Sequence, residues 1–573
     1  MQHDVPPDAG SPEPLPSAPP PSASPESASP PSATEPTSTP AAVPQPSWPG
    51  WANVWARRGE LWRRRGEAWS ARGDHWKNRR ALWTARPRVS LLHRGVLGVL
   101  LVFLAFGLLN VRMLAKYRPA DEPRHAAYAL LLMDGKWPKV SDPLPYDALQ
   151  TGRLNSGNVV AAANHPPLFY WYVGPVLESA SKAQQMDLGI RRARYMVLAL
   201  GAVSLVYMFR IIRLFFPRHP AIALAGMAMV ATLPAYINTV SIVYNDALGI
   251  LTTAGAFHGA MRLLVMGKTR WRLVVTGVWM ALAVFTRISG LFVVMPALLV
   301  AGIAVLVHTE GKWWRRLLHA ALVCTAYVVG MVALSGWFYW RNYKLYGDVT
   351  ASGELLRLFG RRPHGTTMDL LLSDASWESM LNGFFGRLAG GVSLKNGVER
   401  LCHWACFIPL AALPIAALRM GSQARQVIRD RRWFGVLGGV LALVFILVPM
   451  FMYHAKGGNL NGRYAFAIIW FPAMILAAGL ASFRSSTFAV ASVTSFFAIG
   501  LWVVDLYARA LTKRGGAEAS VPFALEANGV RDPWAAWLWA VLLLVAGFAL
   551  VVHAIAKLHR RMDEGDADAA AAA

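Results

Sequence analysis

The chain has 573 residues, of which 55% are hydrophobic and only 16% charged, with a formal net charge of +25. Because soluble chains carry about a quarter charged residues, this composition excludes a single soluble domain, and three cysteines exclude a disulfide-stapled secreted protein. Such a charge in a soluble protein would indicate nucleic-acid binding. Here most of the excess flanks apolar runs, so we expect a multi-pass membrane protein with no nucleic-acid partner.

The N-terminal segment 1–47 is rich in Pro, Ser and Ala and holds almost no large apolar side chains. Such a segment cannot bury enough surface to offset the entropy lost on ordering, so it is predicted to be a disordered tail. A signal peptide begins with basic residues followed directly by an apolar stretch. Segment 1–47 has neither, and we do not expect it to be one.

Segment 48–90 is basic and carries a tryptophan every seven residues, at Trp48, Trp55, Trp62, Trp69, Trp76 and Trp83. On a helix this period gathers the indoles on one slowly drifting face and leaves arginines on the rest, which suits anionic lipids at a membrane surface. Glycines in the same repeat oppose a stable helix in water. The alternative is a solvated basic linker that enforces topology, and both interpretations place the segment in the cytoplasm.

From residue 91 to 562, apolar runs alternate with short polar breaks. A helix crosses the hydrocarbon core in roughly 20 residues, so these runs predict an all-α transmembrane domain of about 12 helices. A disordered tail is expected at 563–573. The predicted spans are 91–111, 194–216, 221–243, 246–266, 273–286, 289–308, 317–338, 401–419, 434–452, 466–483, 487–506 and 535–556. The run 273–308 is too long for one crossing and contains Arg287, which predicts two helices with a tight break.

Lysine and arginine are concentrated in alternate loops, including 268–272 and 312–316. The positive-inside rule then places these loops and both termini in the cytoplasm. The segments 112–193, 339–400 and 507–534 face outward and are too long to be simple turns. Within the first of them, the aromatic run that begins at His165 is expected to form a helix at the outer interface.

Two adjacent carboxylates open the first outward segment, Asp121 and Glu122. Paired carboxylates just above a membrane helix suit a general base or a metal site. The alternative is structural, because Asp121 would also cap a short helix with Pro123 in its first turn. His125 would share a helical face with Asp121, but two such groups are too few to establish a metal site.

More ionisable groups map to the same membrane face: Asp246 after Asn245, Arg287, and Arg463 before Tyr464. Each alone is explained by solvation at a helix end. Together they combine carboxylates with arginines, whose planar fork donates two parallel hydrogen bonds to a phosphate. This set of residues suits the removal of a group from an anionic lipid phosphate.

The motifs that carry these residues follow one another in a characteristic order: Asp121-Glu122-Pro-Arg-His125, His165-Pro-Pro-Leu-Phe-Tyr170, Asn245-Asp246, Thr286-Arg287-Ile-Ser-Gly290, Trp340-Arg341-Asn342 and Asn461-Gly462-Arg463-Tyr464. In this order they resemble the GT-C class of membrane glycosyltransferases. More narrowly, the chain is similar to bacterial relatives of the dolichyl-phosphate-mannose protein mannosyltransferases and of the lipid A aminoarabinose transferases. The resemblance covers 91–485, and neither the tryptophan repeat nor the last spans contribute to it.

The resemblance implies a GT-C fold in the inner membrane and a polyprenyl-phosphate sugar donor. It also implies transfer of a hexosyl or pentosyl group, with inversion, to a lipid, glycan or protein acceptor at the outer face. It implies that Asp121 acts as the base on the acceptor hydroxyl group, and that Glu122 and Asp246 support Asp121 or orient the acceptor. We assign the donor phosphate to Arg287, Arg463 and His165. His125, Asn245 and Tyr464 are assigned further contacts with acceptor or donor.

Two questions stay open from the sequence. No cofactor is predicted, but a divalent metal at Asp121 and Glu122 is left undecided, since paired carboxylates permit it while arginines at the phosphate make it unnecessary. The competing function is a transporter or flippase of a lipid-linked or anionic substrate, which should show repeated halves and ionisable groups near the midplane. A non-catalytic scaffold is the third alternative.

Overall fold

The computed structural model describes residues 59–63, 67, 90–115, 121–144, 159–217, 219–385, 431–481, 486–512 and 520–571. The chain divides into two units, 1–87 and 88–573. The tail predicted at 1–47, most of the tryptophan repeat and the span predicted at 401–419 lie outside the described residues. All of the elements discussed below belong to the second unit.

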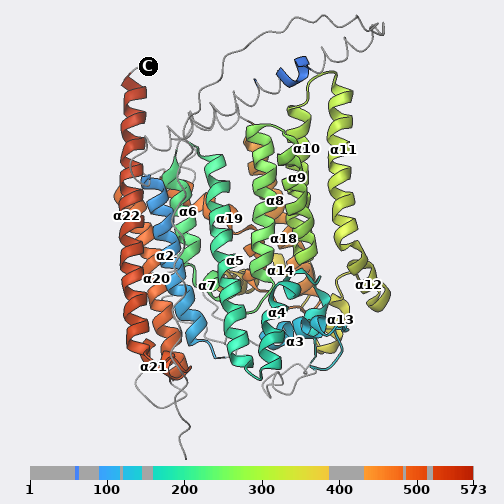
Figure 1. The fold of residues 1–573 in the computed structure, drawn as a ribbon, viewed down its shortest axis with the longest axis vertical. Helices are drawn as coiled ribbons and strands as arrows, with labels where there is room; N and C mark the ends of the chain where they lie inside the picture. The colour runs from blue at the N-terminus through green and yellow to red at the C-terminus, as the bar shows by residue number, and fades with distance from the viewer. Residues whose placement is uncertain are drawn as a thin grey trace, which may run out of the picture. The chain divides into compact units, whose positions relative to one another are not determined.

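The described part of this unit is a bundle of long helices without a β-strand, as the sequence predicts (Figure 1). The long helices are α2 (Leu91–Met113), α5 (Met186–Phe215), α8 (Asp246–Met266), α9 (Arg270–Thr286), α10 (Ser289–Val307), α11 (Trp313–Met331), α18 (Trp433–Ala455), α20 (Ser486–Thr512) and α22 (Pro533–Ala571). In this described part, seven helical segments are long and apolar enough to cross a membrane, or eight with one bent pair. The chain is a multi-pass membrane protein, and the count of twelve spans stays a prediction.

Two predicted spans are broken in the structure. The span predicted at 221–243 is divided into α6 (Pro220–Thr232) and α7 (Pro234–Thr239), with Leu233 extended between them. Proline lacks an N–H group and disfavours a helical residue before it, which explains the break. The span predicted at 466–483 is a 3₁₀ turn, η4 (Gly462–Ile468), followed at an angle of 80° by α19 (Trp470–Ala481).

The tight break predicted inside 273–308 is confirmed. Helix α9 ends at Thr286, Arg287 is extended, and α10 begins at Ser289. A Cβ atom at Gly290 would lie 2.3 Å from the carbonyl oxygen of Ala283, so only glycine lets the two helix ends approach this closely. This close approach fixes Arg287 between two helices.

The short helices gather at one end of the bundle, at the bottom of Figure 1, opposite the C-terminal end of α22. They are α3 (Glu122–Met133), α4 (Leu168–Lys182), α12 (Trp337–Tyr346), α13 (Ser352–Leu358) and α14 (Thr367–Leu371). The helix predicted from the aromatic run at 165–173 is confirmed as α4, although α4 begins later and extends to Lys182. Two more short helices are α15 (Asp374–Phe385) and α21 (Val521–Glu526).

Burial distinguishes the centre of the bundle from its lipid-facing side. In the most apolar window of α8, 83% of the residues are buried, against 17% in the segment formed by α11, a π turn (Val332–Gly336) and α12. Helix α8 is packed on α5, α9 and α10. Its first residue, Asp246, is therefore held at the end of the bundle where the short helices gather.

Candidate functional site

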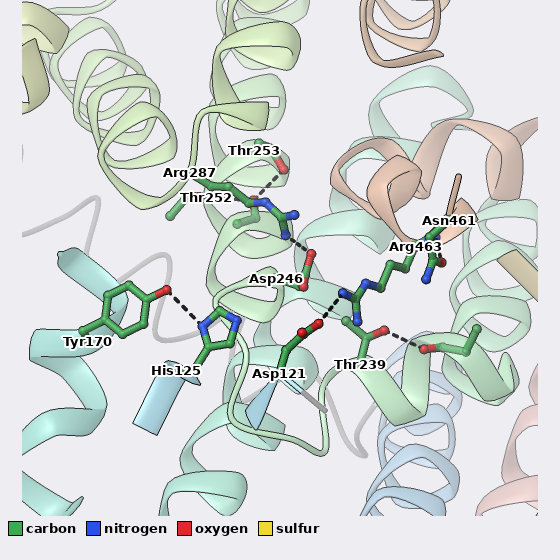
Figure 2. A network of polar contacts seen from close by, with 12 residues as sticks. Asp121, His125, Tyr170, Thr239, Asp246, Thr252, Thr253, Arg287, Asn461 and Arg463 are labelled. Carbon is green, nitrogen blue, oxygen red and sulfur yellow. Dashed lines mark hydrogen bonds and ion pairs between the residues drawn. The ribbon is translucent and has the colours of Figure 1, made fainter. Parts of the chain in front are cut away.

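A cavity of about 430 Å³ opens where α8 and α10 begin. Every site residue predicted from the sequence except Glu122 lines it: Asp121, His125, His165, Asn245, Asp246, Arg287, Arg463 and Tyr464. These residues come from α3, the segment before α4, α8, the α9–α10 break and η4. The fold therefore brings together side chains that are widely separated in the sequence (Figure 2).

Asp121 lies at the N-cap of α3 with Pro123 in the first turn, as the structural alternative predicts. Its side chain nevertheless makes no capping hydrogen bond. Oδ1 instead accepts from Nη1 of Arg124 at 3.1 Å, and Oδ2 accepts from Nη2 of Arg463 at 3.2 Å. With 38% of the side chain exposed, the carboxylate lies between two cations and faces the cavity.

The charge state of Asp121 follows from these neighbours. Burial would raise the pKa of its carboxyl group, but the positive charges of Arg463 and Arg124 hold that pKa below its ordinary value. The carboxylate is therefore ionised at neutral pH. An ionised carboxylate can only accept hydrogen bonds, so it can receive a proton from a hydroxyl group in the cavity.

Arg463 is aimed by the local backbone. Asn461 caps the 3₁₀ turn η4, and its side chain accepts from the backbone N–H of Arg463 at 3.1 Å. The guanidinium of Arg463 lies 4.9 Å from the ring centroid of Tyr244 and 5.7 Å from that of Tyr464. These rings and Asp121 hold the arginine side chain in one orientation.

A second ion pair joins Asp246, at the first turn of α8, to Arg287 in the α9–α10 break (Figure 2). The guanidinium of Arg287 lies 5.6 Å from the ring centroid of Tyr464, so Arg287 and Arg463 both lie beside this tyrosine ring. A carboxylate at a helix N-terminus is stabilised by the helix dipole. The pair thus places a fixed guanidinium on the cavity wall.

Two histidines and a tyrosine form a further group. Nδ1 of His125 lies 2.9 Å from the hydroxyl oxygen of Tyr170, and the His125 and His165 rings are stacked with centroids 6.2 Å apart. Burial lowers the pKa of His125 to about 4, against the opposing charges of Asp121 and Asp246. Burial and the nearby arginines also hold the pKa of His165 well below its ordinary value. Both rings are therefore neutral at pH 7.

Glu122 is placed apart from the cavity. Its side chain is fully buried and accepts two hydrogen bonds from Arg194 of α5, at 2.8 Å and 2.6 Å. It also accepts from the backbone N–H of Val243 at 3.0 Å. Arg194 donates in addition to the carbonyl oxygens of Leu114 and Ala115, which follow α2. Glu122 therefore ties together α3, α5, the end of α2 and the segment before Asp246, and it does not line the cavity.

The residues proposed for a metal do not fit one. Asp121 and Glu122 are adjacent in the sequence, but their carboxylates face different arginines and do not converge. In the described part of the chain, no three His, Cys, Asp or Glu side chains come together as a metal would require.

Several cavity residues were missed by the sequence analysis. Arg124, Asn164, Tyr453 and Lys456 all line the cavity. The position of Arg124 three residues after Asp121 on a helix could have identified it. Asn164 directly precedes His165 and Lys456 lies seven residues before Arg463, so these two could also have been identified. Tyr453 could not, because its distance to the site depends on how α18 packs against the other helices.

Comparison with known proteins finds one family model that matches part of the chain. The profile described as dolichyl-phosphate-mannose-protein mannosyltransferase matches residues 164–340, which include His165, Asp246 and Arg287. No curated protein sequence matches the chain.

Three solved structures illustrate the similarity. ArnT from Cupriavidus metallidurans, bound to undecaprenyl phosphate, is 15% identical over 81% of this chain and 77% of its own, with a TM-score of 0.40. The S. cerevisiae Pmt1–Pmt2 complex bound to the sugar donor is 17% identical over 48% of this chain and 37% of its own, with a TM-score of 0.31. AglB from Archaeoglobus fulgidus is 12% identical over 79% of this chain and 55% of its own, with a TM-score of 0.35. The chain is thus similar, through residues 164–340, to the dolichyl-phosphate-mannose-protein mannosyltransferases.

Proposed function

We propose that this chain transfers a sugar from a polyprenyl-phosphate donor to a lipid, glycan or protein acceptor, at the outer face of the inner membrane. The observation that carries this proposal is the convergence in one cavity of an ionised carboxylate, Asp121, with the two guanidinium groups of Arg287 and Arg463. Such a cavity can accept a proton and stabilise a leaving phosphate in the same step.

In the proposed reaction the acceptor hydroxyl oxygen attacks the anomeric carbon as Asp121 takes its proton. The bond between that carbon and the phosphate oxygen breaks, and polyprenyl phosphate leaves with the bonding electron pair. One displacement inverts the configuration of the anomeric carbon. Arg287, Arg463 and Lys456 surround the space where the negative charge of the leaving phosphate develops.

The cavity wall also suits a lipid-linked donor. Phe292 of α10 and Ile446 and Met450 of α18 give the cavity an apolar side. A polyprenyl chain would lie against these residues while its phosphate contacts the arginines. A hexosyl or a pentosyl group would fit the same chemistry.

The distribution of basic residues supports the proposed orientation. Lys268 and Arg270 follow α8, and Lys312 precedes α11, so these residues lie at the end of the bundle opposite the cavity. By the positive-inside rule, this distribution supports the proposal that both termini lie in the cytoplasm and that the cavity opens at the outer face.

The test is transfer of radiolabelled sugar from cell-derived polyprenyl-phosphate sugars into membrane acceptors, at matched expression. We expect Asp121→Asn and Arg463→Ala to lose the labelled product. The matched controls are Asp134→Asn, at the other end of α3, and Arg357→Ala on α13, where the arginine is exposed. Equal product from all variants would reject the assigned site. Movement of the lipid-linked sugar across the membrane without transfer would favour the transporter alternative.

A further inference from the structure

A second cavity, of about 330 Å³, lies between the end of α2, the start of α5 and the turn that connects α21 to α22. Its polar lining consists of Arg112, Asp187, Arg191, Arg194, Asn528 and the backbone at Gly529. No residue lines both this cavity and the cavity of Asp121. A ligand of this cavity would therefore bind apart from the proposed sugar donor and acceptor.

The charges in this cavity do not cancel. Arg194 is neutralised by Glu122. Within the described residues, neither Arg112 nor Arg191 forms an ion pair with a carboxylate. Asp187 lies in the first turn of α5, where the N-terminal end of the helix dipole stabilises its negative charge. Apart from Arg194, which Glu122 neutralises, the cavity is lined by two arginines and one carboxylate, that of Asp187. Its lining therefore carries a net positive charge.

Both arginines belong to packed helices, and Arg112 is also held by an aromatic ring. The guanidinium of Arg112, in the last turn of α2, lies 5.6 Å from the ring centroid of Tyr195 on α5. Arg191 lies one turn before Tyr195 on the same helix. Asn528 donates to the carbonyl oxygen of Met113 at 2.9 Å, which fixes the third wall against the end of α2. The two cations are thus presented by packed elements rather than by a loop.

The level of this cavity in the membrane follows from its neighbours. Helix α2 spans the membrane and ends at Met113, and α22 begins at Pro533. Near the start of α22, Trp534 and Trp539 are 70% and 67% exposed, as in the aromatic belts at membrane–water interfaces. The cavity therefore lies at the level of the lipid headgroups.

From this arrangement we infer that the cavity binds the phosphate of an anionic phospholipid headgroup, with Arg112 and Arg191 as its ligands. Arginine forks match the oxygen geometry of a phosphate and can donate two parallel hydrogen bonds. Because the cavity lies at the level of the headgroups, membrane lipids surround it at high local concentration. This inference does not depend on the glycosyltransferase activity.

The test measures phosphatidylglycerol retained by the full-length protein, using native mass spectrometry of detergent micelles at increasing lipid concentration. We expect the double variant Arg112→Gln, Arg191→Gln to bind the lipid about tenfold more weakly or worse, as the loss of charge-assisted hydrogen bonds predicts. Arg192→Gln is the matched control, because Arg192 is exposed on the same helix and does not line the cavity. It should bind like the wild type.

Three further results decide the inference. The double variant Arg112→Lys, Arg191→Lys keeps the charges, and we expect it to keep the wild-type melting temperature and bind severalfold more weakly, because ammonium groups lack the fork. Unchanged binding in both double variants, or an equal loss in Arg192→Gln, would overturn the site. Displacement of the lipid by inorganic phosphate at the same concentration would overturn the choice of a lipid headgroup over free phosphate.

Discussion

Arg463 donates to Asp121 over 3.2 Å, although the two residues are separated by 342 positions. This contact joins η4 to the start of α3 across the cavity. Asp121 also accepts from Arg124 of its own helix, so the carboxylate is held from two sides. A donor phosphate that enters the cavity competes with Asp121 for Arg463. In the proposed reaction, phosphate binding therefore frees the carboxylate to take a proton.

This competition predicts that replacing Asp121 and replacing Arg463 have opposite effects on the binding of polyprenyl phosphate. Asp121→Asn removes the charge that competes for Arg463, so the variant should bind polyprenyl phosphate at least as tightly as the wild type. Loss of the base should lower the transfer rate by about 100-fold or more. Arg463→Ala should weaken binding as well as transfer. Binding of labelled polyprenyl phosphate, measured beside kcat, checks both. Weaker lipid binding in Asp121→Asn would contradict the proposed competition.

The neighbour of Asp121 should behave differently when it is replaced. Glu122 and Arg194 form a buried ion pair, and removal of one partner leaves the other charge uncompensated. Arg194→Met should therefore lower the free energy of unfolding by about 3–5 kcal/mol. Glu122→Gln, Arg194→Met should recover part of this loss. Thermal unfolding in detergent measures the change.

Asp121→Asn is the natural control for these variants, because its side chain is partly exposed and faces the cavity. We expect it to melt within a few degrees of the wild type. If Asp121→Asn destabilised the protein as much as Arg194→Met, the distinction between the two adjacent carboxylates would be wrong.

The different roles of Asp121 and Glu122 show where sequence reasoning ends. The ordered motifs and the alternation of apolar runs predicted the helical membrane fold and eight of the residues that line the cavity. They could not tell which of two adjacent carboxylates faces it, because successive residues at a helix start point in different directions. The partner of Glu122 is Arg194, 72 positions away. In the sequence Arg194 is simply the first residue of a predicted span, and only packing reveals the pair.

The break at Leu233 was missed for another reason. Hydropathy averaged over a span is insensitive to a single Pro234, so 221–243 was predicted as one helix. The break matters because α7 and the turn after it bring Val243 to Glu122 and Asp246 to the cavity. The proline signal was present and was outweighed by the length of the apolar run.

Gly290 offers a test of the α9–α10 break. A Cβ atom there would lie 2.3 Å from the carbonyl oxygen of Ala283, and backbone atoms cannot move aside as a flexible side chain can. Gly290→Ala should cost about 1–3 kcal/mol of stability and displace Arg287, which should weaken polyprenyl-phosphate binding. Gly330→Ala on α11 is the control, since no atom lies within 4 Å of its Cβ position. Wild-type binding in Gly290→Ala would show that the break does not position Arg287.

The buried histidines predict a dependence of stability on pH. The pKa of folded His125 is about 4, below the ordinary 6.5, so the unfolded chain binds a proton that the folded chain does not. The stability contributed by neutral His125 is therefore fully present above pH 6.5 and is lost as the pH falls towards 4, with a total on the order of 3 kcal/mol. His165 acts in the same direction. The depressed pKa of Asp121 contributes stability that is lost only at lower pH.

Melting temperatures at pH 7.5 and pH 5.0 separate these contributions. The wild type should melt at a lower temperature at pH 5.0. His125→Gln keeps a hydrogen-bonding group beside Tyr170 but cannot become charged, so its decrease should be smaller. His93→Gln, which replaces an exposed histidine on α2, should keep the full wild-type decrease. An equal decrease in His125→Gln and the wild type would mean that His125 does not resist protonation in the folded protein, and its assignment as a neutral ring in the cavity would fail.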